Sequence, residues 1–165
     1  MIAIEQLATQ PEYRSLAYSL TQNEEHARDL LQEATYLILK SWDSFQPGSN
    51  FAAWAKTIIR NTFITDYRKA KRRRGLIERD QPQQTWTGER VVDNLAEQDM
   101  TITEINRLID QLPPNYRRAF RLHLNGVKYK DIAVITNSPI GTAKSRVNTA
   151  RRLLKTELAK VGVER

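Results

Sequence analysis

Residues 128–158 constrain the fold more than any other stretch, because they hold a short apolar periodicity, a break and a longer periodicity. The short periodicity is one helical face, made of Tyr129, Ile132, Ala133 and Ile135. Asn137 interrupts it, and asparagine tolerates the left-handed conformation that ends helices. Ser138 then predicts a side-chain cap, and Pro139 suits the first position of the next helix, where no N–H is needed. The stretch therefore predicts a helix, a tight turn and a second helix.

The second helix of this pair has two contrasting faces. Its apolar face recurs every three or four residues, at Ile140, Ala143, Val147, Ala150, Leu154 and Leu158. Its other face is cationic and hydrogen-bonding, with Lys144, Ser145, Asn148, Arg151, Arg152 and Lys155. Solvated faces usually mix charges of both signs, whereas this face is almost free of acids. The pattern favours a helix-turn-helix that enters a DNA major groove over an ordinary solvated hairpin.

The charge of the chain is unevenly distributed. The 165 residues carry 26 basic and 19 acidic side chains, a net charge of +7. Residues 101–165 hold 13 basic and 5 acidic residues, a net of +8, whereas residues 76–100 hold 2 and 6, a net of −4. Such an excess favours a polyanion through counterion release. It would also suit an anionic membrane surface, but no apolar run approaches a spanning length, so we expect no membrane insertion.

Cysteine and histidine argue against metal and thiol chemistry. With no cysteine, the chain has no disulfide and no thiolate metal site, which is compatible with a reducing cytoplasm. His26 and His123 lie in no metal-ligand spacing, so we expect surface or packing roles for both. No metal and no cofactor are predicted.

Helical periodicity dominates the rest of the chain and strand signals are nearly absent, which predicts an all-α fold. Three helices are expected first, at residues 11–20, 24–45 and 51–71. The second has an apolar stripe, and Asn23 predicts its cap. The stripe is Ala27, Leu30, Leu31, Ala34, Leu37, Ile38 and Trp42. The third is expected to bury Phe51, Trp54, Ala55, Ile58, Ile59 and Phe63.

Two small helical domains are therefore predicted. Residues 1–75 form a three-helix bundle, and residues 101–165 form a four-helix domain that ends in the helix-turn-helix. The first helix of the second domain has an apolar stripe of Ile102, Ile105, Leu108, Ile109 and Leu112. The next helix carries Tyr116, Phe120, Leu122 and Leu124 and is closed by Asn125-Gly126. Residues 76–100 are polar, acidic and poor in periodicity, which predicts a flexible linker with an isolated Trp86.

Two separated blocks of sequence resemble one known family. The block LPPNYRRAFRLHLNGVKYKDIAVITNSPIGTAKSRVNTAR closely resembles region 4 of bacterial sigma factors. DLLQEA together with FQPGSNFAAWAKTIIRNTFITDYRKAKRR resembles region 2. The order of the blocks, the two-domain size and the missing region 3 are similar to the extracytoplasmic-function (ECF) group of the sigma-70 family. The resemblance implies a sigma factor that binds the β′ and β subunits of core RNA polymerase, directs initiation at promoter DNA, and is held inactive by an anti-sigma factor.

The resemblance also implies where the polymerase docks. In the family, the DxxQE helix docks on the coiled coil of the β′ subunit, which here designates Asp29, Gln32 and Glu33. These residues lie one turn apart, on the face opposite Leu30 and Leu31, so they are available as a polar patch.

The resemblance implies two DNA sites. For recognition and melting of the minus-ten element it designates Ser49, Asn50, Phe51, Lys56, Arg60, Asn61, Thr65, Arg68 and Lys69. Asn61 matches a base-reading position and the cations suit phosphate. For the minus-thirty-five element it designates Ser138, Thr142, Lys144, Ser145, Arg146, Asn148, Thr149, Arg151 and Arg152. Asn148 and Thr149 stand where aromatic or basic residues are common in the family, so the promoter sequence does not carry over.

Two other functions compete with this interpretation. A stand-alone helix-turn-helix regulator with an N-terminal sensing domain has no need for the DLLQEA patch or for a second cationic helix. An enzyme acting on DNA needs clustered carboxylates for metal ions, or a nucleophile held by a base. Because Asp29, Glu33 and Asp66 are scattered, no catalytic residue is predicted.

Overall fold

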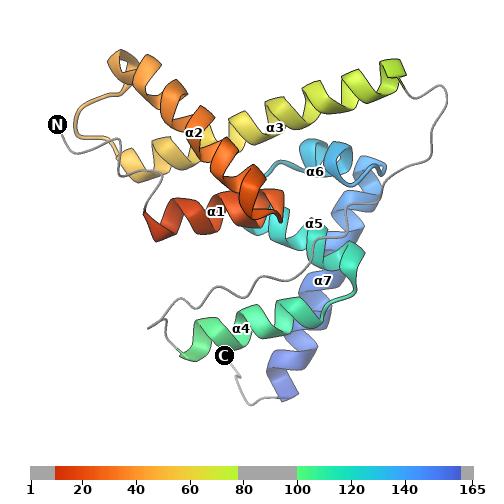
Figure 1. Ribbon diagram of the computed structural model, residues 1–165. Helices are drawn as coiled ribbons and strands as arrows, with labels where there is room; N and C mark the ends of the chain where they lie inside the picture. Colours follow the sequence, from red (N-terminus) through yellow and green to blue (C-terminus); the bar gives the residue numbers. More distant parts are fainter. Residues whose placement is uncertain (1–9, 78–99, 161–165) are drawn as a thin grey trace. The chain divides into compact units, whose positions relative to one another are not determined.

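The computed structural model describes residues 10–77 and 100–160, and this part of the chain is helical with no strand, as predicted (Figure 1). In the first half these elements are α1 (Pro11–Thr21), α2 (Glu24–Lys40), the 3₁₀ turn η2 (Trp42–Ser44) and α3 (Phe51–Ile77). In the second half they are α4 (Met100–Gln111), α5 (Pro114–Leu124), α6 (Tyr129–Ile135) and α7 (Ile140–Lys160). The chain divides into two compact units, Met1–Glu89 and Arg90–Arg165, called here the first and second units. Apart from residues 76–77 and 100, the predicted linker lies outside the described residues, as does Trp86.

The first unit is a three-helix bundle in which α1 packs on both α2 and α3, and α2 packs on α3. Local chemistry sets the helix ends. Gln22 takes the left-handed conformation, with a φ of 57°, and ends α1. The Asn23 side chain then accepts a hydrogen bond from the His26 N–H at 3.0 Å, so the predicted cap of α2 is confirmed.

The core of the first unit follows the predicted stripes in part. Its buried apolar residues are Tyr13, Ala17, Leu20, Ala27, Leu30, Leu31, Ala34, Ile38, Ala55 and Ile59. Of the residues that the third helix was expected to bury, Ala55 and Ile59 are buried, whereas Phe51, Trp54, Ile58 and Phe63 are half-buried. The prediction that Trp42 continues the stripe of α2 is wrong, because Trp42 is 44% exposed. The helix ends at Lys40, and the Ser41 hydroxyl donates to the carbonyl of Leu37. Trp42 therefore lies in η2, where the helical phase no longer applies.

Helix α3 is longer than predicted, since it continues to Ile77 rather than ending near residue 71. The added turns contain Arg72, Arg73, Arg74 and Gly75. Arginine is a good helix former, cations suit a helix C-terminus, and one glycine costs only about 1 kcal/mol. The cationic run is therefore displayed on a helix.

The second unit places α7 against α4, α5 and α6. Its buried apolar residues are Ile109, Leu112, Ala119, Phe120, Leu122, Val127, Ile132, Ala133, Ala143, Val147, Ala150 and Leu154. Two residues of the predicted apolar stripes are instead exposed, Ile105 by 40% and Ile140 by 49%, and Leu124 of α5 is exposed by 58%. Leu124 is the last residue of α5 and Ile140 is the first of α7, and neighbours are fewest at helix ends.

Both turns around α6 end a helix in the same way. Asn137 has a φ of 44°, and the Ser138 N–H donates to the carbonyl of Ala133 at 2.9 Å. Gly126 has a φ of 77°, and the Val127 N–H donates to the carbonyl of Leu122 at 3.0 Å. These are six-to-one bonds of the Schellman motif. The left-handed conformation predicted for Asn137 is confirmed, and it sets the turn between α6 and α7.

Candidate nucleic-acid interface

The three residues predicted to dock on the polymerase lie together on α2. Asp29, Gln32 and Glu33 are all exposed, whereas Leu30 and Leu31 are 5% and 3% exposed. The apolar neighbours hold the helix on the bundle and leave the two carboxylates and the amide on the outer face. The structure therefore brings this predicted patch together.

The loop between η2 and α3 is a tight turn built on proline and glycine. The Ser49 N–H donates to the Gln46 carbonyl at 3.1 Å, and Gly48 has a φ of 88°. Pro47 followed by a residue with positive φ is the signature of a type II turn. A Cβ on Gly48 would meet no atom within 4 Å, so the constraint at this position comes from the backbone conformation alone.

Two residues predicted to bind the minus-ten element also shape this loop. The Asn50 side-chain oxygen accepts a hydrogen bond from the Ala53 N–H at 3.0 Å, which caps α3. The Ser49 hydroxyl donates to the Gln46 carbonyl at 2.7 Å. The amide NH₂ group of Asn50 carries the donors suited to a base edge. Both side chains are exposed at the end of the loop.

Four aromatic side chains that flank this loop form a cluster that was not predicted from the sequence. The Phe45 ring lies 5.7 Å from Trp42, 5.7 Å from Phe51 and 5.1 Å from Trp54, measured between centroids. The Phe45 and Phe51 rings meet edge to face, at 87°. Phe45, Phe51 and Trp54 are half-buried. Four aromatics within 13 residues, bracketing a Pro-Gly turn, were the available signal.

The predicted base-reading stripe of α3 is exposed as expected. Asn61, Thr65 and Arg68 lie within about 60° of one another around the helix, and all three are exposed. Lys69 lies beside them, and its ammonium is 3.6 Å from the Asp66 carboxylate. The stripe combines an amide, a hydroxyl and cations, which together suit a base edge and phosphates.

Two other predicted phosphate ligands of α3 already have partners inside the first unit. Lys56 forms an ion pair with Glu12 of α1. Arg60 donates from Nε to the Lys56 carbonyl at 3.0 Å and from Nη2 to the Thr57 hydroxyl at 3.2 Å. Both are half-buried, so they lie apart from the exposed stripe.

Helix α7 presents most of its predicted DNA residues on one exposed face. The exposed members are Lys144, Ser145, Asn148, Arg151 and Arg152, and the half-buried ones are Ser138, Thr142, Arg146 and Thr149. Around the helix, Thr142, Arg146 and Thr149 point about 140° or more away from Lys144. The structure therefore does not bring these three together with the exposed residues. The Ser138 hydroxyl lies 2.8 Å from the Thr136 hydroxyl, just before the helix begins.

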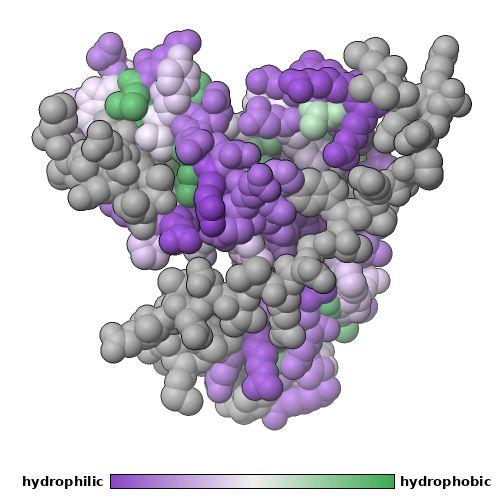
Figure 2. Space-filling view, in the orientation of Figure 1, coloured by the Kyte–Doolittle hydropathy of each residue, from purple (hydrophilic) through white to green (hydrophobic). Residues whose placement is uncertain are grey.

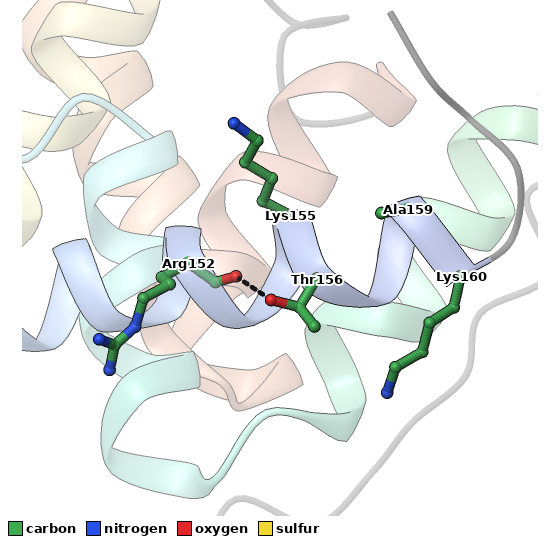
Figure 3. A pocket seen from close by; sticks show the side chains of 5 residues that line it. All are labelled: Arg152, Lys155, Thr156, Ala159 and Lys160. Atoms are coloured by element: carbon green, nitrogen blue, oxygen red, sulfur yellow. Dashed lines mark hydrogen bonds between the residues drawn. The ribbon is translucent and has the colours of Figure 1, made fainter.

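The cationic face continues along the C-terminal half of α7. A shallow hollow there is lined by Arg152, Lys155, Thr156, Ala159 and Lys160 (Figure 3). The Thr156 hydroxyl donates to the Arg152 carbonyl at 3.1 Å, and the Lys160 ammonium lies 2.7 Å from the Glu157 carboxylate. Arg152 and Lys155 project from the ribbon in Figure 3, which extends the positive surface by a further turn.

His123 packs against α6 and α7, which fits the packing role expected for it, and it also contacts Arg151 of α7. Its ring stacks on Tyr129, with centroids 5.0 Å apart and planes at 15°. Its Nε2 lies 2.7 Å from Nη2 of Arg151. Burial lowers the pKa of His123, and the positive charge of Arg151 lowers that pKa further. Arg151 is 28 residues away, so no local pattern could reveal the contact.

Two kinds of site, namely metal-binding groups and membrane-spanning helices, are missing from the part of the chain described. No group of three or more His, Cys, Asp or Glu side chains there could hold a metal ion. Among the same residues, no helix combines the length and apolar character needed to cross a membrane. Figure 2 shows that much of the visible face of these residues is hydrophilic.

The comparisons with known proteins cover both units. The Sigma-70 region 2 family matches residues 7–73, and the Sigma-70, region 4 family matches residues 102–154. The ECF RNA polymerase sigma factor EcfG of Rhodopseudomonas palustris (strain TIE-1) is 39% identical over 168 residues, covering 96% of this chain and 85% of the relative. The ECF RNA polymerase sigma factor SigE of Mycolicibacterium smegmatis is 31% identical over 150 residues, covering 88% of this chain and 56% of SigE.

One solved structure resembles the whole chain. It is a co-crystal structure of the sigma factor RpoE in complex with the anti-sigma factor NepR, from Bartonella quintana. The two chains are 30% identical, with a TM-score of 0.52, and the match covers 98% of this chain and 96% of that one.

Proposed function

Because the chain belongs to the extracytoplasmic-function group of sigma-70 family sigma factors, we propose that it binds core RNA polymerase and directs promoter-specific transcription initiation. One observation carries the proposal: α3 and α7, in separate units, each present an exposed face that combines cations with hydrogen-bonding groups. One such face would suffice for a simple DNA-binding regulator. Two faces match a protein that contacts two promoter elements.

The first unit is assigned to polymerase docking and to the minus-ten element. The exposed Asp29, Gln32 and Glu33 form the docking patch for the β′ coiled coil. Asn50 and the exposed stripe of α3 are proposed to contact an unstacked base and its phosphates, and their exposure supports this. Lys56 and Arg60 contribute after they exchange their internal partners for phosphate.

The second unit is assigned to the minus-thirty-five element. Lys144, Ser145 and Asn148 lie in the N-terminal half of α7, which is the part that a helix-turn-helix inserts into the major groove. Arg151 and Arg152 lie further along and suit phosphates. The domains are proposed as residues 1–75 and 101–165, joined by a linker of residues 76–100.

Regulation by an anti-sigma factor is part of the proposal. The solved relative, RpoE, was crystallised with its anti-sigma factor NepR, and it matches nearly the full length of this chain. We infer that an anti-sigma factor covers parts of both units and prevents polymerase binding. Because the proposed partners are RNA polymerase and promoter DNA, we propose that the protein acts in the cytoplasm. The proposed function includes no reaction catalysed by this protein itself.

The direct test is run-off transcription with purified core RNA polymerase on a library of promoter fragments. We expect discrete start sites only when this protein is present. Their absence, together with no binding of the protein to core polymerase, would exclude the proposal. Sequence-specific DNA binding without polymerase binding would instead favour the stand-alone regulator.

A further inference from the structure

His123 of α5 contacts both α6 and α7, and its partner on α7 is a side chain of the proposed DNA-binding surface. It comes from the last turn of α5, its ring stacks on Tyr129 at the start of α6, and Nε2 meets Arg151 of α7. An arginine guanidinium only donates hydrogen bonds, so a hydrogen bond at this 2.7 Å contact requires Nε2 to accept. That in turn requires a neutral ring with its proton on Nδ1.

Arg151 lies on the stripe of α7 that faces DNA in the proposed function. It is within about 60° of Lys144 and Asn148 around the helix, and all three are exposed. A free arginine side chain has many rotamers, and part of this rotamer entropy is lost when the side chain binds phosphate. A partner that already fixes the guanidinium reduces that loss on binding.

The geometry leaves Arg151 able to bind phosphate while it is held. The guanidinium has five N–H donors in a planar fork, and the contact with His123 involves one nitrogen, Nη2. The remaining donors suit a charge-assisted bond to a phosphate oxygen. Stacking on Tyr129, at an interplanar angle of 15°, fixes the plane of the imidazole and therefore the direction of its acceptor.

We propose that His123 is a positioning residue for DNA binding, which holds the guanidinium of Arg151 in the orientation that contacts a backbone phosphate. The inference rests on the proposed function, because it requires that α7 bind DNA. His123 contributes through Arg151 and not through a DNA contact of its own. If His123 had only a structural role, substituting it would lower the stability of the second unit, and any effect on DNA affinity would be the same with or without Arg151.

The tautomer is the first test, and it needs no DNA. Long-range ¹⁵N–¹H NMR spectra of the full chain at neutral pH distinguish the two neutral forms of a histidine ring. We expect the Nδ1–H form for His123. An Nε2–H form would overturn the proposal, because that nitrogen could not accept from Arg151.

A double-mutant cycle is the second test. His123→Phe keeps a ring for stacking and removes the acceptor, whereas His123→Gln offers an amide oxygen near the position of Nε2. The full-length variants are titrated by fluorescence anisotropy against a short random-sequence duplex at low salt, because a phosphate contact is independent of sequence. We expect His123→Phe to weaken binding about fivefold and His123→Gln to stay within about twofold of wild type.

The Arg151→Ala background separates this inference from the proposed function. There, His123→Phe should change the affinity by less than about 1.5-fold, because nothing remains to be positioned. If Arg151→Ala itself binds like wild type, Arg151 is not a phosphate ligand. Its phosphate contact in the proposed function and its positioning by His123 are then both wrong. If Arg151→Ala weakens binding but His123→Phe does not, or if the loss persists without Arg151, only the positioning role of His123 is wrong. Circular dichroism of each variant checks that the fold is retained.

Discussion

The side chains that shape this protein have two kinds of partner, namely backbone groups close by in the chain and side chains on another helix. Asn23 and Asn137 act on backbone groups within a few positions, so their cap and turn could be predicted from residue chemistry. The contact of His123 with Arg151 and the ion pair of Glu12 with Lys56 join different helices. No sequence pattern encodes such pairs, because they depend on how the helices pack.

Lys144 and Arg151 are expected to affect DNA binding differently. Lys144 lies in the first turns of α7, where a helix reaches base edges, so Lys144→Ala should weaken minus-thirty-five discrimination by about 1–3 kcal/mol. Arg151→Ala should weaken binding to all sequences alike and lower the salt slope by about one. Competition titrations of holoenzyme on specific and scrambled duplexes measure both effects. Equal losses on the two duplexes for Lys144→Ala would contradict its role in base recognition.

The stability of the second unit should depend on pH through His123. Burial and the Arg151 charge place the folded pKa of His123 below the ordinary value of 6.5. The unfolded chain then binds more protons than the folded one as the pH approaches that folded pKa. The stabilisation is therefore present above pH 6.5 and is lost as the pH falls through the folded pKa.

The comparison with His123→Gln isolates this effect. Urea unfolding of both proteins is measured from about pH 7.5 to about pH 5. We expect wild type to lose stability relative to the glutamine variant as the pH falls, since Tyr129 and Arg151 face a ring that gains a charge. A constant difference across this range would mean that His123 titrates normally in the folded protein.

At the scale of elements, the order of the helices was predictable and two of their ends were not. Apolar spacing located every predicted helix within the described residues, because packing against a core requires that spacing. Helix α2 ends early where the Ser41 hydroxyl bonds to the Leu37 carbonyl, and α3 continues past residue 71 without a core to hold it. Neither outcome is visible in apolar periodicity, because both involve polar and charged residues.

The cap of α3 is expected to stabilise the loop that precedes it. Asn50→Ala removes the acceptor for the Ala53 N–H, so it should lower the free energy of unfolding by about 1 kcal/mol. Asn50→Ser keeps a capping oxygen and should cost much less. Urea titration monitored by tryptophan fluorescence is suitable, because Trp42 and Trp54 lie in the aromatic cluster. Equal stability of the alanine and serine variants would show that the cap contributes nothing.

At the scale of the whole molecule, the family of the chain was predictable from two sequence blocks in a fixed order. The matches to regions 2 and 4 and to EcfG confirm that prediction. The assignment of each exposed patch to a partner stays a prediction. Exposed polar residues fit a ligand and plain solvent equally well, so only binding measurements separate the two.

Polymerase binding should be separable from promoter recognition by the second unit. Asp29 and Glu33 are exposed on α2, and substitutions at such sites usually change stability by about 0.5 kcal/mol or less. The double variant Asp29→Ala, Glu33→Ala should therefore keep the fold and its affinity for duplex DNA while losing core polymerase in a pull-down. Glu25→Ala with Arg28→Ala, on the same helix, is the matched control. If the control variant also lost polymerase binding, the loss could not be attributed to Asp29 and Glu33 specifically.

The end of α3 has a consequence for how the helix responds to its surroundings. Every residue from Arg68 to Gly75 is exposed, so no apolar packing holds these turns. Arg68 with Arg72, and Lys69 with Arg73, place like charges four residues apart, which opposes helix formation. Dissolved ions weaken that repulsion over about 10 Å at 0.1 M salt, and a neighbouring row of phosphates would weaken it more. The last turns of this helix should therefore fray in buffer of low salt and become helical when they bind a nucleic acid strand. The free energy needed to form these turns would then reduce the net free energy of binding.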